Sequence, residues 1–171
     1  MIKGERPSGD DQRAPVGGRP PRSEIDETNK AIIGALQLDG RRAYADIAAE
    51  LGISSEQVET RVARLRDAGV IQITAVSDPL QLGFARQAML GITVEGRTAK
   101  AVAQQIAEVP EIVYVVITAG GFDLLAEVVG DSDAHLLELV TARVKPLPGV
   151  KAIHTFLYLE LEKQTYTWGV R

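Results

Sequence analysis

The 171-residue chain contains no cysteine and only two histidines. The absence of cysteine excludes a disulfide framework, a thiolate metal site and a cysteine nucleophile. Two histidines are too few for a multi-histidine metal site, and we expect neither a metal nor a cofactor. No apolar run reaches the roughly 18 residues that a membrane helix needs, and the N-terminus lacks the apolar core of a signal peptide. We therefore expect a cytoplasmic protein with no membrane partner.

Positive charge is also scarce, with 19 basic against 23 acidic residues and a net charge of −4. Residues 24–80 carry six basic and ten acidic residues, whereas residues 1–23 carry five basic and three acidic ones. Nucleic-acid-binding domains are usually basic, because counterion release from phosphates supplies most of their non-specific affinity. Charge alone therefore does not favour a nucleic-acid partner.

The first 23 residues differ in composition from the rest, with four glycines and four prolines among few apolar residues. Such a segment cannot bury enough surface to offset its ordering entropy. We predict a disordered tail over residues 1–23.

Helical periodicity begins at Ile25. Asp26 is a suitable N-cap, and an apolar stripe of Ile32, Ile33 and Leu36 follows it. A second short helix carries Ile47, Ala48 and Leu51 and ends at Gly52.

The third helix has the clearest start and end signals. Ser54 and Gln57 form a capping box, and Gly69 is placed to end the helix in the left-handed conformation. The buried face is Val58, Val62 and Leu65. Residues 70–76 are expected to form a strand that Asp78-Pro79 ends. The pattern predicts a winged helix-turn-helix domain over residues 24–80.

The second half alternates differently. Its expected elements are a strand at 88–94, a helix at 98–109, strands at 112–118 and 124–129, a helix at 131–144 and a strand at 153–161. This β-α-β-β-α-β order is the ferredoxin-like arrangement. We expect an α+β chain with a linker at 81–87, a ferredoxin-like domain at 88–162 and a C-terminal segment at 163–171.

Six motifs in register resemble the Lrp/AsnC (feast/famine, leucine-responsive) family of bacterial and archaeal transcriptional regulators. The matching stretches are Ile25-Asp26-Glu27 through Leu36, Asp39-Gly40-Arg41 with Ile47 through Ser54, Val58 through Ile71, Val109-Pro110-Glu111, Gly120 through Asp123, and Leu147 through Val150 with Thr155. The chain departs from the family at Ala43, where a hydroxyl residue usually caps the second helix, and at Asn29, where aspartate is common.

The resemblance implies sequence-specific binding of double-stranded DNA, with the third helix in the major groove. The candidate contacts are Ser54, Ser55, Glu56, Glu59 and Thr60 near base edges and Arg61, Arg64, Arg41 and Arg42 at phosphates. The alternative for the helix arginines is an ordinary solvated surface. Because the two glutamates repel phosphate, each module should bind weakly and depend on an oligomer for affinity.

The resemblance also implies a small effector, an amino acid by class, bound at the loop between two strands. The candidate contacts are Thr118, Gly120, Gly121, Phe122 and Asp123. Glycine N–H groups can hold a carboxylate, and an aspartate can meet an α-amino group. The plain alternative is a hairpin turn with glycines at the bend. The family forms homodimers that commonly assemble into octamers, and we expect the same here.

Two other functions remain open. Some Lrp-like proteins are tetrapyrrole decarboxylases that use histidines and basic residues. This chain has no histidine before His135 and no cluster of basic residues in its second half, so we do not expect an enzyme. The acidic balance also leaves room for a sensor whose helix-turn-helix mediates protein interaction. Asp131, Asp133 and His135 resemble a metal cluster, but an acidic helix N-terminus explains them more simply.

Overall fold

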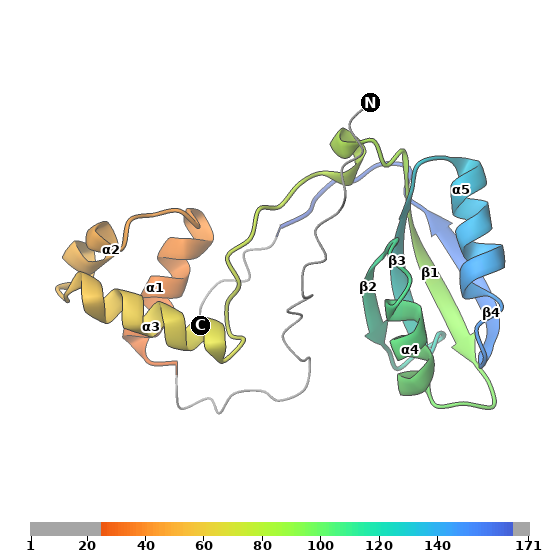
Figure 1. Cartoon of the computed structure of the whole chain (residues 1–171), viewed down its shortest axis with the longest axis horizontal. Helices are drawn as coiled ribbons and strands as arrows, with labels where there is room; N and C mark the ends of the chain where they lie inside the picture. Colours follow the sequence, from red (N-terminus) through yellow and green to blue (C-terminus); the bar gives the residue numbers. More distant parts are fainter. Residues whose placement is uncertain (1–24, 166–171) are drawn as a thin grey trace. The chain divides into compact units, whose positions relative to one another are not determined.

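A computed structural model describes residues 25–165, apart from the side chain of Leu80. The expected tail at 1–23 and most of the expected C-terminal segment lie outside the described residues. The chain divides into two units, one ending at Ala75 and one spanning Val76–Gln164. The first contains helices α1 to α3, within residues 27–67, and the second contains the sheet (Figure 1). Each unit has its own hydrophobic core. Among the described residues, no helix is long and apolar enough to cross a membrane.

Three helices make up the first unit: α1 (Glu27–Leu38), α2 (Tyr44–Leu51) and α3 (Ser55–Asp67). Their apolar stripes meet in one core cluster, as the helical periodicity predicts. Its fully or nearly fully buried members are Ile32, Leu36, Ile47, Ala48, Val58 and Val62. The core fixes α3 with one face inward and the opposite face in solvent.

Local signals set the ends of these helices as predicted. The Asp26 carboxylate accepts a hydrogen bond from the Asn29 N–H at 2.7 Å and caps α1. Both bonds of the Ser54–Gln57 capping box are present at the start of α3. Ala43 provides no side-chain cap for α2. At the other end of α2, the turn to α3 begins at Gly52, which adopts the left-handed conformation with φ of 66°.

The strand predicted over 70–76 is wrong, because residues 71–78 form no regular secondary structure. The apolar residues that suggested it have separate environments. Ile71 packs against the helical core, whereas Ile73 and Val76 are largely exposed. A strand needs a ladder partner to be stable, and the described part of this chain supplies none to this segment.

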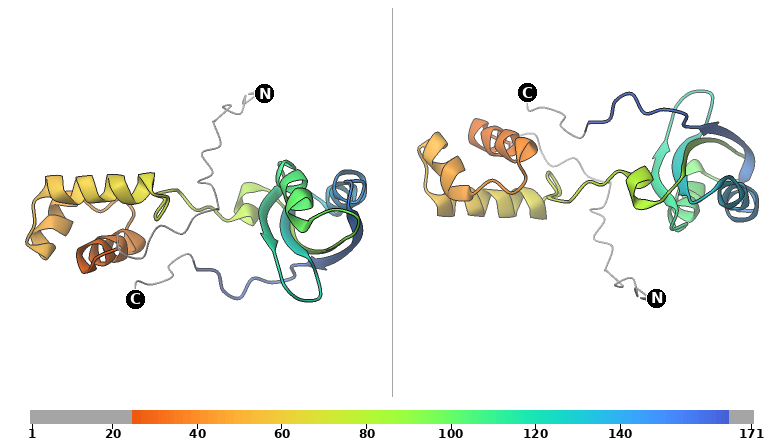
Figure 2. Two further views of the ribbon diagram at one scale, coloured as in Figure 1. Left: turned by 90° about the horizontal axis from the view of Figure 1, so that it is seen from below. Right: turned by 90° about the horizontal axis from the view of Figure 1, so that it is seen from above.

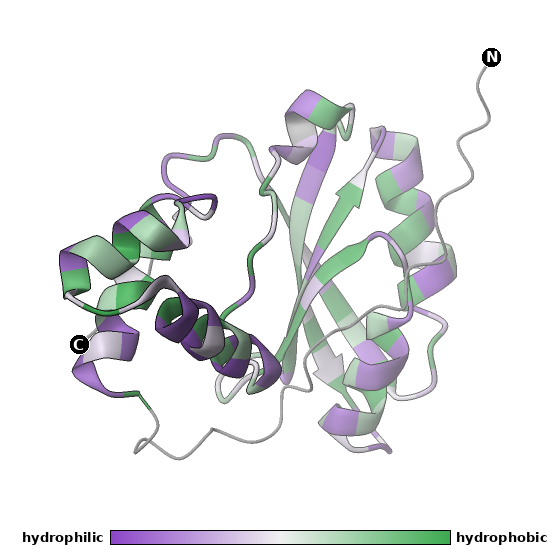
Figure 3. Ribbon diagram, turned by 60° about the vertical axis from the view of Figure 1, so that its left-hand side comes forward, coloured by the Kyte–Doolittle hydropathy of each residue, from purple (hydrophilic) through white to green (hydrophobic). Residues whose placement is uncertain are grey.

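The second unit contains an antiparallel sheet in the order β2-β3-β1-β4. Its elements are β1 (Arg86–Val94), α4 (Ala99–Ala107), β2 (Ile112–Ile117), β3 (Leu124–Gly130), α5 (Asp133–Glu138) and β4 (Val150–Leu157). The strands are largely hydrophobic (Figure 3). Both helices pack on one face of the sheet (Figure 2), where Leu90, Ala126, Val102 and Leu139 share a core. The ferredoxin-like prediction is confirmed.

The main differences from the expected boundaries lie in β1, α5 and β4. β1 begins at Arg86, inside the expected linker, and α5 continues from Leu139 to Val144 as a π-helical turn. β4 spans Val150–Leu157 rather than 153–161. Its last bonded neighbour is the start of β1, where the Tyr158 N–H donates to the Gln87 carbonyl at 2.9 Å. Residues 159–165, which follow this bond, pair with no strand in the part of the chain that the structure describes.

No helix of this unit, within its described residues, packs on the other face of the sheet. Register places Gly91 of β1 opposite His154 and Met89 opposite Phe156 on this open face. The Phe122 ring lies directly over Gly91, because a Cβ at that position would come within 2.8 Å of three ring carbons. Phe122 also meets the His154 and Phe156 rings at centroid distances of 5.4 and 5.9 Å. The open face is therefore an aromatic surface that needs cover.

Candidate functional site

The outer surface of α3 carries most of the predicted base-contacting residues. Ser55, Glu56, Glu59 and Thr60 are all exposed, as is Ser54, whose hydroxyl accepts from the Gln57 N–H at 3.2 Å. By helical periodicity, Glu56 and Thr60 point away from the buried positions Val58, Val62 and Leu65. The structure thus gathers these five polar side chains along one turn and a half at the start of the helix.

Arg61 is bonded within the domain. Its Nη1 donates to Asp26 Oδ2 at 2.8 Å and to Asn29 Oδ1 at 2.9 Å, so that α3 is tied to the first turn of α1. The hydrogen bond from the Asn29 N–H, with the Arg61 guanidinium beside it, holds the pKa of Asp26 below its ordinary value. A phosphate contact by Arg61 would require it to exchange these partners.

Of the other three arginines predicted to contact phosphates, one is paired within the domain and two are not. Arg42 pairs with Glu50 of α2, whereas the Arg41 side chain is exposed and its N–H donates to the Asp39 carboxylate. Arg64 is exposed on α3. Within residues 25–165, neither Arg41 nor Arg64 has an ion-pair partner, so these two guanidiniums are available to an anionic ligand.

A hollow of about 940 Å³ runs along α3 beside the start of α1. Thr60, Arg61 and Arg64 line it together with the carboxylates of Asp26 and Glu56. Both signs of charge therefore border the surface on which the sequence predicts nucleic-acid contact. The acidic side chains are expected to oppose a phosphate backbone.

The second predicted site is the loop between β2 and β3, and hydrogen bonds close it tightly. The Thr118 N–H donates to the Asp123 carbonyl at 2.9 Å, and its hydroxyl donates to the Phe122 carbonyl at 2.6 Å. Asp123 Oδ2 accepts from the Val94 N–H at 2.7 Å and fastens the loop to β1. Gly120 and Gly121 stand exposed at the bend. This geometry fits the hairpin-turn interpretation and leaves the glycine backbone accessible to a ligand.

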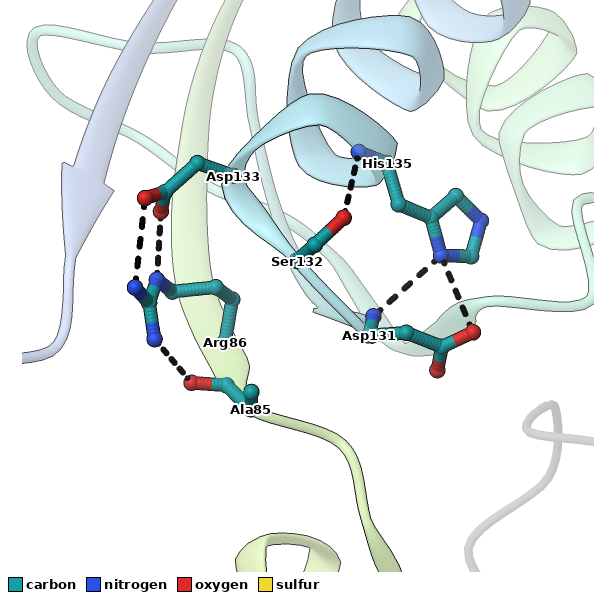
Figure 4. A network of polar contacts seen from close by, with 6 residues as sticks. All are labelled: Ala85, Arg86, Asp131, Ser132, Asp133 and His135. Atoms are coloured by element: carbon teal, nitrogen blue, oxygen red, sulfur yellow. Dashed lines mark hydrogen bonds and ion pairs between the residues drawn. The ribbon is translucent and has the colours of Figure 1, made fainter.

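The segment 131–135 forms the polar network in Figure 4. Arg86 forms an ion pair with Asp133, which lowers the pKa of that carboxyl and raises that of the guanidinium. Ser132 caps α5, and the His135 ring nitrogen Nδ1 accepts from the Asp131 N–H at 3.2 Å. No group of three metal-ligating side chains occurs in the part of the chain that the structure describes.

Sequence reasoning missed the polar contacts of the open face. Gln87 Nε2 donates to Glu127 Oε1 at 2.8 Å, and Tyr158 bonds to the same carboxylate. Burial, with the adjacent Glu127 charge, raises the pKa of Tyr158 to about 12. A glycine in mid-strand at Gly91 was the available signal for the Phe122 packing, because such glycines often mark close approaches.

Replacement of Glu127 by glutamine is expected to lower the pKa of Tyr158 toward the ordinary value near 10. The substitution removes the negative charge that opposes phenolate formation, while burial stays. Since the folded pKa is raised, its stabilising contribution is present below about pH 10 and is lost as pH rises through 12. Phenolate absorbance during an alkaline titration measures the shift. Glu95→Gln, at an exposed pair with Lys151, is the control and should leave the Tyr158 titration unchanged.

Comparison with known proteins assigns the chain to the class of regulators in which a DNA-binding helix-turn-helix domain is joined to an α+β domain. The AsnC-type helix-turn-helix domain matches residues 25–66, and the C-terminal dimeric alpha+beta barrel domain of AsnC-type regulators matches residues 84–171. The HTH-type transcriptional regulator FL11 of Pyrococcus horikoshii is 32% identical over 145 residues, which are 84% of this chain and 95% of that protein. The chain belongs to the Lrp/AsnC family of DNA-binding transcriptional regulators.

Solved structures agree on the fold. Escherichia coli AsnC covers 82% of this chain and 95% of its own at 22% identity, with a TM-score of 0.73. The regulator NMB0573 of Neisseria meningitidis, in complex with L-Met, covers 82% and 94% at the same identity and TM-score. FL11 of Pyrococcus furiosus is also 32% identical, over 84% of this chain. The curated relatives compared are named as transcriptional regulators.

Proposed function

We propose that this regulator binds duplex DNA as a dimer, with one α3 helix from each copy in the major groove, and that a small effector at the β2–β3 loop modulates binding. The observation that carries the proposal is the outward face of α3. It has a capped N-terminus, short polar side chains and the exposed guanidinium of Arg64, which has no ion-pair partner among the described residues. A helix of this kind can enter the major groove with its N-terminal residues at base edges.

Within the interface, Ser55, Thr60 and the exposed glutamates of α3 approach base edges. Glu56 and Glu59 can accept from cytosine amino groups, which gives them a role in selecting sequence. Arg64 and Arg41 contact phosphates. With ten acidic and six basic residues over 24–80, one module supplies little counterion release, so DNA binding depends on joining two modules.

Replacement of Arg64 by alanine is expected to weaken binding to all duplex sequences. The slope of log affinity against log salt concentration should fall by about 1.8, because the dimer loses one phosphate contact from each copy and each contact on B-DNA is worth about 0.9. Fluorescence anisotropy with a labelled duplex over a range of salt concentrations gives both quantities. Lys100→Ala makes the same change in net charge on α4 and serves as the control. An unchanged slope in the Arg64 variant would remove this residue from the interface.

For the effector we propose an amino acid held by the exposed Gly120-Gly121 backbone, with Thr118 and Phe122 shaping the site. The L-Met complex of NMB0573 supports this ligand class. Asp123 already accepts a bond from Val94 through one oxygen, so its second oxygen is the one proposed to meet the α-amino group. Calorimetric titration with each of the twenty amino acids tests the proposal. A lack of heat from every one of them would contradict it.

The open sheet face is the proposed dimer contact, and further association to an octamer is proposed by family resemblance. The aromatic surface of Phe122 and Phe156 supports the first step, as does the description of the matched domain as dimeric. Sedimentation equilibrium, with and without the amino acids, measures both steps.

A further inference from the structure

We infer that Arg61 is a positioning residue: its bonds to Asp26 and Asn29 hold α3 against the first turn of α1 and thereby set the orientation in which α3 meets DNA. This inference rests on the proposed DNA-binding function and changes the role that the sequence predicted for Arg61. It concerns three residues that we call the clasp, namely Asp26, Asn29 and Arg61.

The two oxygens of the Asp26 carboxylate accept hydrogen bonds from different donors in the clasp. One Asp26 oxygen accepts from the Asn29 N–H at 2.7 Å and caps α1, while the other accepts from Arg61 at 2.8 Å. The same Arg61 nitrogen reaches Asn29 Oδ1 at 2.9 Å. The Asp26 carboxylate therefore caps α1 and binds Arg61 of α3 at the same time, because each bond uses a different oxygen.

Exposure is consistent with a positioning role. The Arg61 side chain is 34% exposed and the Asp26 side chain is 52% exposed, so neither is buried. Isolated exposed ion pairs contribute little to stability. The consequence of this pair is geometric instead, because the bonds from Arg61 to Asp26 and Asn29 join α3 to the first turn of α1.

The position of Asp26 means that the inference predicts the direction in which DNA affinity changes when the carboxylate is removed. Asp26 lines the same hollow as Thr60 and Arg64, on the surface proposed to face DNA. On charge alone, removal of this carboxylate should strengthen binding to a polyanion. If the clasp orients α3, removal of the carboxylate should weaken binding instead, because the recognition helix loses its fixed direction.

The experiment uses the full chain and a labelled duplex that the wild-type protein selects from a random-sequence pool. Asp26→Asn keeps a good N-cap residue and removes the charge. Arg61→Met keeps an aliphatic stem and removes the guanidinium. Each variant is expected to weaken binding about three- to tenfold, and the double variant about as much as either one, since both break the same contact.

Salt dependence separates positioning from phosphate contact. The slope of log affinity against log salt should stay at the wild-type value in both single variants, whereas Arg64→Ala should lower it by about 1.8, which is about 0.9 for each copy of the dimer. Circular dichroism confirms that each variant is folded at the assay temperature. If Arg61→Met does not fold, Asp26→Asn alone decides the question.

Tighter or unchanged binding by Asp26→Asn would overturn the clasp, as would a reduced slope in Arg61→Met. A wild-type protein that selects no duplex at all would overturn the proposed function itself. The two failures are therefore distinguishable.

Discussion

A glutamate in place of Phe156 is expected to convert the protein to monomers and to weaken DNA binding by about a hundredfold or more. Phe156 lies on the open face of the sheet, half exposed and in contact with the Phe122 ring. Between two copies, a carboxylate at this position would lose its hydration without a partner. The fold of each copy should survive, because α4 and α5 pack on the opposite face.

Sedimentation equilibrium and a DNA titration measure the two effects on the same preparation. The control is Leu137→Glu, which places the same charge at an apolar side chain that is 64% exposed. Leu137 belongs to α5, which packs on the opposite face of the sheet. The control should remain dimeric and bind DNA normally. A Phe156→Glu protein that stays dimeric would show that another surface joins the copies.

Replacement of Ile47 by alanine is expected to unfold the helical unit while the sheet unit stays folded. Ile47 is 1% exposed at the centre of the helical core, and such truncations cost about 2–5 kcal/mol. A unit of this size has a free energy of unfolding of only a few kcal/mol. The separate cores allow one unit to unfold without the other. DNA binding should therefore be lost and dimerisation kept.

Urea unfolding followed by circular dichroism shows whether the helical transition alone moves to lower denaturant. Leu38→Ala at the end of α1 provides the control, because that side chain is 86% exposed and its loss should change little. A single transition that shifts as a whole would mean that the two units unfold together.

The helices were predictable because their signals are local. Asp26, Ser54 and Gly69 act within a few positions of themselves, and each has the predicted role. The strand at 70–76 failed for the converse reason. Alternating apolar residues indicate a strand only where a neighbour completes the ladder, and the pattern says nothing about that neighbour.

In the candidate DNA-binding site, too, features set by local sequence were predictable and contacts between distant residues were not. Helical periodicity correctly predicts which residues of α3 are exposed, since exposure follows from the position of the core stripe. It could not predict that Arg61 would meet Asp26, a residue 35 positions earlier in the chain. The Phe122 contact with Gly91 likewise depends on strand register, which the sequence of neither segment specifies.

The acidic balance of the DNA-binding segment leads to the central claim that two weak modules joined in a dimer supply the affinity. Comparison of a selected duplex with a second one, in which one half-site is replaced by unrelated sequence, tests this claim directly in the wild-type protein. We predict that the second duplex binds about a hundredfold to ten-thousandfold more weakly at equal salt. Equal affinities for the two duplexes would contradict the account.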